Sequence, residues 1–444
     1  MRIKLIAAAL SGALAGFNTA QAYDLMDIYK EAFVRDPVVQ QAKAQRDQAY
    51  AAIDEATAAL LPQIDVAGSY TGYRTSDNDL IGANANRRSA QAQLSLSQVI
   101  WQHSSWINRS MAEKQATRYN LAYNDALQKL IIRVSTAYFD VLNASDALTY
   151  SKANNAALKN QLDRAEKQFN VGLIAETDKL EAQAACDLSN AAVIAAENNL
   201  TNSYEEIRAL IGRPLTVDEL SDLNTQRFST PSVVQDLKNL IRHAEGNNLA
   251  LQEAAVARDI AKDNISLARS GHEPVVSLNA SAGTGYTDYN TQTASQRDGN
   301  AWTQSLGLTV SVPIYHGGAT TAKTREAEAA YVQASQALEQ AHRNLLSTVT
   351  SDYNNVNAAI SSVRAYELSV KSADSALKAT QAGYDVGTRT MTDVLDATQN
   401  LYSAKQNAAN ARYTYILSRL SLRYDGGSLK VQDLEDVNSG LNKR

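Results

Sequence analysis

The sequence predicts an exported membrane protein of mixed α and β structure, built from two equivalent halves. Three observations predict this fold class. The 444-residue chain has a secretory leader, helical segments too long for a globular domain, and a pair of strand patterns in each half. Together they indicate a long helical body joined to a sheet that can enter a lipid bilayer.

Residues 1–22 have the three parts of a secretory signal peptide. Arg2 and Lys4 form the charged region, residues 5–17 are mostly apolar, and Ala20-Gln21-Ala22 is the small-residue cleavage motif. The apolar part is too short for a membrane-spanning helix. We expect the mature chain to begin after this motif. It contains no later apolar run of 18 residues, so we assign membrane contact to strands.

Two segments without glycine or proline predict very long helices. They are residues 111–170 and 319–382, and shorter clean segments follow each of them, at 173–211 and 388–425. Sixty helical residues extend about 90 Å. Apolar residues recur within them at spacings of three and four, which is typical of helices packed as in coiled coils.

The regions 62–101 and 274–315 each predict two β-strands. In Ile64, Val66, Gly68 and Tyr70, apolar or small residues alternate with polar ones, and the other strands have the same period. Segments of about ten such residues suit tilted membrane strands with one lipid-facing and one wet face. Two ordinary hairpins on a soluble domain would show the same alternation.

The chain repeats itself at an offset of 212 to 215 residues. FNVGLIAETDKLEAQ begins at Phe169 and resembles GYDVGTRTMTDVLDAT, which begins at Gly383. We therefore divide the mature chain into repeats 23–230 and 231–444, the second with a short C-terminal tail. Each repeat is expected to contain a helix, two strands, a long helix, a turn and a shorter helix.

The predicted strand number requires more than one copy of the chain. Four strands cannot close a barrel, because the smallest membrane barrels have eight. An open sheet edge in lipid would leave backbone groups unpaired. The chain must oligomerise, as two or three copies, or lie outside the membrane.

Composition argues against several functions. The net charge of −5 lacks the basic excess of a nucleic-acid-binding protein. The five histidines are scattered without metal-ligand spacing, and no phosphate-binding or nucleophile motif occurs, so we expect neither an enzyme nor a cofactor. The single cysteine, Cys186, is expected to be a small half-buried side chain.

In the second repeat, Asp393 and Asp396 follow directly after the predicted turn. At a spacing of three they share a helix face. Their position fits helix capping, with Thr390 or Thr392 as the N-cap and acids near the positive helix end.

These motifs resemble those of the TolC family of outer-membrane efflux and secretion ducts. The resemblance covers essentially the whole mature chain. It rests on NVG followed by TD in the first repeat, and on VGTRT, DVLDAT, VPIYHGG and LYSAKQNAANARY in the second.

The resemblance implies a homotrimer in the outer membrane of a Gram-negative bacterium. Each chain would give four strands to one twelve-stranded barrel in outer-membrane lipid, continued by a periplasmic helical barrel. The partners implied are a periplasmic adaptor protein and an inner-membrane transporter of RND, ABC or MFS type. Drugs, other small molecules or proteins would pass through the duct, which opens at its periplasmic end by an iris-like helix movement.

The resemblance also assigns residues to the periplasmic end. Asp393 and Asp396 would form two carboxylate rings at the narrowest point of the pore, where crowding raises some pKa values and attracts cations. The turns at Gly172 and Gly387 would lie at the tip and contact the adaptor.

Family positions further imply links that hold the entrance closed. Tyr384 would hydrogen-bond Asp178 within one chain, and Arg389 would pair with Thr177 or Asp178 of its neighbour. Gln161 belongs to the same set of gate links. A solvated helix-end charge is the alternative reading of Arg389.

Two positions depart from the family pattern or extend it. Gln381 stands where an acidic residue assists closure, so that link is expected to be weaker here. Glu181 repeats the position of Asp396 in the first half, and the sequence leaves open whether it faces the lumen. A non-conducting trimeric tether or adhesin is the competing function, although it would need neither the two-faced strands nor the aspartate pair.

Overall fold

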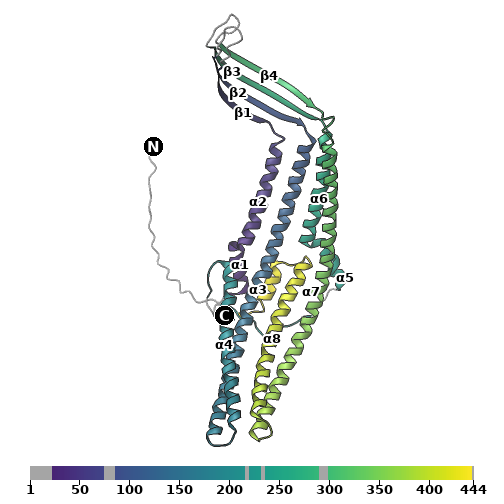
Figure 1. The fold of residues 1–444 in the computed structure, drawn as a ribbon. Helices are drawn as coiled ribbons and strands as arrows, with labels where there is room; N and C mark the ends of the chain where they lie inside the picture. The colour runs from purple at the N-terminus through teal and green to yellow at the C-terminus, as the bar shows by residue number, and fades with distance from the viewer. Residues whose placement is uncertain (1–22, 75–85, 216–219, 232–235, 290–298, 443–444) are drawn as a thin grey trace, which may run out of the picture.

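The computed structural model describes residues 23–74, 86–215, 220–231, 236–289 and 299–442. Figure 1 shows an elongated molecule with a sheet at one end and two helical hairpin tips at the other. The elements in chain order are α1 (Leu25–Arg35), α2 (Pro37–Ala58), β1 (Gln63–Arg74), β2 (Asn86–Trp101), α3 (His103–Asn170), α4 (Glu176–Ile211), α5 (Leu237–Asn247), α6 (Leu249–Arg269), η1 (Ser270–His272), β3 (Val275–Tyr289), β4 (Gly299–Ser311), α7 (Ala319–Asp385), α8 (Met391–Asp425) and α9 (Val431–Asn438).

The four strands form one antiparallel sheet in the order β1-β2-β3-β4. Each repeat contributes a hairpin, and β2 joins β3 across the two repeats with Leu94 opposite Ala282. The register shifts between Val99 and Trp101, just before β2 ends. The strands fall within the predicted regions 62–101 and 274–315. The middle of each predicted hairpin loop lies outside the described residues.

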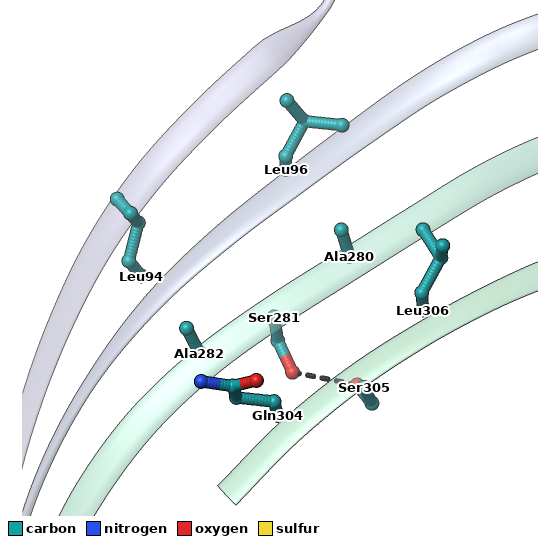
Figure 2. A pocket seen from close by; sticks show the side chains of 8 residues that line it. All are labelled: Leu94, Leu96, Ala280, Ser281, Ala282, Gln304, Ser305 and Leu306. Atoms are coloured by element: carbon teal, nitrogen blue, oxygen red, sulfur yellow. Dashed lines mark hydrogen bonds between the residues drawn. The ribbon is translucent and has the colours of Figure 1, made fainter.

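The sheet has two chemically different faces, as the alternation predicted. Leu96, Ala280 and Leu306 are paired in register and lie on one face, part of which Figure 2 shows. Ser281 and Ser305 lie on the opposite face, where their hydroxyls are 2.8 Å apart. The apolar face is well exposed in the single chain, with Leu306 at 76% exposure. A continuous exposed apolar face of this kind needs lipid or another protein surface to cover it.

The long helices form as predicted, and they run from the sheet to the tips (Figure 1). Nearest the sheet, α2, α3, α6 and α7 lie side by side in that order. Farther down, α3 pairs with α4 and α7 pairs with α8. None of the described helices is both long and apolar enough to cross a membrane. The leader predicted at 1–22 lies outside the described residues.

The main core lies midway along the molecule, where the helical hairpins meet α1. Tyr138 and Phe139 of α3 are fully buried there, and Phe139 packs against Tyr413 of α8 with ring centroids 5.7 Å apart. The Tyr413 hydroxyl donates a hydrogen bond of 2.7 Å to Asp146. Because these residues come from both repeats, the core fixes the two halves to each other.

Candidate functional site: the hairpin tips

The two turns named by the sequence repeat have the same backbone geometry. Gly172 and Gly387 have φ values of +77° and +78°, which favour glycine. In the first turn the Leu173 amide donates to the Gln168 carbonyl, and in the second the Thr388 amide donates to the Gly383 carbonyl, both at 2.8 Å. These bonds close the C-terminal ends of α3 and α7 in the same way.

Both turns carry exposed apolar side chains at the far end of the molecule. Val171, Leu173 and Val386 are between 70% and 75% exposed. Behind them a small separate core joins three helices, with residues from α3 and α4 packed against Met391 and Leu395 of α8. The beginning of α8 is therefore held against the α3–α4 hairpin.

Asp393 caps the helix on which it lies. The Thr390 hydroxyl accepts a hydrogen bond from the Asp393 amide at 3.2 Å, and the Asp393 carboxylate accepts one from the Thr390 amide at 2.9 Å. These hydrogen bonds, with a smaller contribution from the charge of Arg389, hold the pKa of Asp393 below its usual value. The capping interpretation is confirmed, with Thr390 rather than Thr392 as the N-cap.

Asp396 lies one turn after Thr392 and lines a groove between α8 and the α3–α4 hairpin. The groove has a volume of about 310 Å³ and is lined by both apolar and polar side chains, with Glu181 and Asp396 among the polar ones. The Glu181 carboxylate accepts a hydrogen bond of 2.5 Å from the Thr392 hydroxyl. Glu181 therefore points at α8. Cys186 is buried in the small core of the tip.

One face of α3 is linked to the end of α7. The Gln161 side-chain amide donates a hydrogen bond of 3.1 Å to the Gln381 side-chain oxygen, so Gln161 contacts α7. One turn farther, Arg164 lies 3.9 Å from Asp385. The Gln381 amide also donates to Asp385 at 3.3 Å, which joins the two contacts into one network.

The predicted partner of Tyr384 is wrong. Its hydroxyl donates a hydrogen bond of 2.7 Å to the Gln168 side chain, instead of bonding Asp178. Burial raises the pKa of Tyr384, and the nearby charge of Asp178 adds to the effect. Asp178 is thus a neighbour of Tyr384, while the last turn of α3 supplies the acceptor. Gln168 lies seven residues after Gln161, on the same helix face.

Arg389 lies beside the end of α7. A methyl group on Gly383 would come within 2.7 Å of the Arg389 Cγ, so the arginine stem occupies the space that this glycine leaves open. Thr177 and Asp178 lie in the first turn of α4, in the other hairpin. Any pairing of Arg389 with these two residues across chains stays a prediction.

Three linking residues were missed by sequence reasoning. Gln168 and Arg164 are ordinary polar residues of a long helix outside the quoted motifs, whereas Thr392 lies inside the second repeat motif but was considered only as an N-cap. The spacing of 161, 164 and 168 on one helix face was the available signal.

Comparison with protein families gives one match in each half of the chain. The model of the outer membrane efflux protein family matches residues 28–213 and again 240–424. The two matches fall one in each predicted repeat.

Individual proteins agree with this match over the full chain. The outer membrane protein TolC of Vibrio cholerae is 43% identical, with 99% of this chain and 98% of the relative covered. TolC of Escherichia coli is 40% identical, covering 99% of this chain and 90% of the relative. The alkaline protease secretion protein AprF of Pseudomonas aeruginosa is 30% identical over 94% of this chain and 87% of its own length.

Solved structures share the fold. CusC, described with its transmembrane channel formation, superposes with a TM-score of 0.79 at 18% identity, covering 91% of this chain and 92% of its own. The Campylobacter jejuni CmeC outer membrane channel gives 0.77 at 17% identity, covering 100% and 98%. The family resemblance expected from the sequence is confirmed by these comparisons and those with TolC.

Proposed function

Because the chain belongs to the outer membrane efflux protein family, we propose that it is the outer-membrane exit duct of efflux pumps and type I secretion systems. It conducts drugs, other small molecules or proteins passively from pump to exterior. The observation that carries this proposal is the full-length similarity to TolC, combined with a sheet that is apolar on one face only. The family matches give no support to a non-conducting tether or adhesin.

The working form is a homotrimer in the outer membrane of a Gram-negative bacterium. One chain supplies four strands with β1 and β4 at the free edges, so three copies give twelve strands in one closed barrel. Closure removes the unpaired edges and turns the apolar face toward lipid. The helices continue the duct into the periplasm, where an adaptor protein and an inner-membrane transporter of RND, ABC or MFS type are the partners. The exposed Gly172 and Gly387 turns are the proposed adaptor contacts.

The gate is proposed at the tip. Asp393 and Asp396 of three chains would give two rings of carboxylates around the entrance, and such rings attract cations. The α3–α7 links through Gln161 and Tyr384 favour a closed hairpin pair within each chain. Arg389 is proposed to extend this closure to Thr177 or Asp178 of the next chain. Opening would separate the α7–α8 hairpin from α3 and α4.

Conductance in a planar bilayer tests the duct and its constriction. The purified trimer is expected to give a small cation-selective current that millimolar multivalent cations block. Changing Asp393 and Asp396 to Asn keeps side-chain oxygens for capping and removes six charges per trimer, so the block should be lost. Block that survives in this variant would move the constriction elsewhere. A folded trimer without any conductance would contradict the duct itself.

A further inference from the structure

The hydrogen bond between Glu181 and Thr392 joins α4 to α8, whereas the links described above join α3 to α7. Glu181 lies in the second turn of α4, and Thr392 is the second residue of α8. Their side-chain oxygens are 2.5 Å apart although the residues are 211 positions apart in the chain. The contact thus bridges the two sequence repeats at the tip.

Thr392 has a particular place relative to the carboxylates. It immediately precedes Asp393, and Asp396 follows one helical turn later on the same face. The carboxylate of Asp393 already accepts a capping hydrogen bond from the Thr390 amide. A contact that holds Thr392 therefore sets the position of both aspartates together with the first turn of α8.

The hydrogen bond lies beside a packed apolar interface between α4 and α8. Met391 and Leu395 of α8, on either side of Thr392, are buried with Ala182 and Cys186 of α4. Glu181 precedes Ala182 directly, so the hydrogen bond lies at the exposed rim of this small core. Thr392 is the polar partner that the described part of the chain gives to the Glu181 carboxylate.

We propose that Glu181 is a positioning residue of the gate, which through Thr392 holds the first turn of α8, with Asp393 and Asp396, against α4. This inference rests on the proposed duct function. It adds an α4–α8 link to the α3–α7 links, so that both helices of the α7–α8 hairpin are linked to the α3–α4 hairpin. When the entrance opens, this hydrogen bond breaks together with the others.

Paired substitutions separate the link from general packing. Thr392→Val keeps the shape of the side chain and removes the hydroxyl, whereas Thr392→Ser keeps the hydroxyl. We expect the valine variant to shift the open-to-closed ratio by about two- to tenfold per link. The serine variant should behave as the wild type. Glu181→Ala should match the valine variant, and the double variant should add nothing further.

Gln183 provides the matched control on α4. Its side-chain amide donates a hydrogen bond of 3.0 Å to Asp187 of the same helix. Gln183→Ala therefore removes a hydrogen bond within α4 and leaves the α4–α8 hydrogen bond in place. Single-channel recording of each trimer gives the readout, and thermal unfolding checks that the variants fold alike.

Equal opening of the valine and serine variants would overturn the inference, as would additive effects in the double variant. If the wild type conducts and Tyr384→Phe opens it, such results reject only the Glu181 link. If the folded wild type does not conduct at all, the duct function fails first.

Discussion

Tyr384→Phe is the most direct test of the gate, because it removes a single hydrogen bond and leaves the ring in place. The hydroxyl donates to Gln168 at 2.7 Å in a half-buried position between α7 and α3. Such a bond contributes about 0.5–1.5 kcal/mol net. A trimer contains three, and a concerted opening would break all three, for a total of about 1.5–4.5 kcal/mol. The open-to-closed ratio should then rise by roughly ten- to two-thousand-fold.

Single-channel conductance measures this ratio directly. Tyr402→Phe is the matched control, since it removes a hydroxyl from α8 that makes no hydrogen bond within the described part of the chain. Gln168→Ala should open the channel to a similar degree, and combining it with Tyr384→Phe should add little, because both remove the same bond. If the conductance of Tyr384→Phe equals that of Tyr402→Phe, the α3–α7 contact does not hold the entrance.

Three further predictions test the sheet, the midpoint of the helices and a tight turn. Leu306→Arg, on the apolar face, should cost about 2–4 kcal/mol of folding stability in lipid, while Ser305→Arg on the other face should cost little, as measured by denaturant titration in vesicles. Burial is the main cause that raises the pKa of Asp425 to about 7, so its contribution to stability is present below about pH 4 and lost as pH rises through about 7. The melting temperature of Asp425→Asn should therefore fall less than that of the wild type between about pH 5 and 8. Gly427→Ala should lower the melting temperature, because φ is +68° and a methyl group would lie 2.6 Å from the Asn247 carbonyl carbon.

The sequence predicted the fold well because its main features are local. Strand alternation has a period of two, so the positions of Ile64 and Val66 already determine which face each residue joins. The long helices follow from segments without glycine or proline, and the tip turns from Gly172 and Gly387. Capping at Thr390 and Asp393 is also local, since the partners are three residues apart.

The contacts between hairpins were harder to predict because they depend on how whole helices are rotated. A polar residue on a helix of 68 residues can meet any neighbour that its face reaches. The Tyr384 hydroxyl donates its hydrogen bond to Gln168, and not to Asp178, because the last turn of α3 lies next to the end of α7. Glu181 and Thr392 meet for the same kind of reason, and no pattern around either residue indicates it.

The duplication also predicts how one chain joins the next. Within a chain, β2 pairs with β3 across the repeats, and Leu94 lies opposite Ala282. The repeat offsets make Leu308 the equivalent of Leu94, and Tyr70 the equivalent of Ala282. If β4 joins β1 of the neighbouring copy as β2 joins β3, Leu308 lies opposite the neighbour's Tyr70. Both residues belong to the apolar face. The junction between two chains requires this, because a register shift of one residue would turn the apolar side chains of one strand inward. Cysteines at 308 and 70, in a Cys186→Ser background, should therefore link chains into covalent trimers on oxidation. Cysteines at 309 and 70 should not, and equal linking by both pairs would contradict this register.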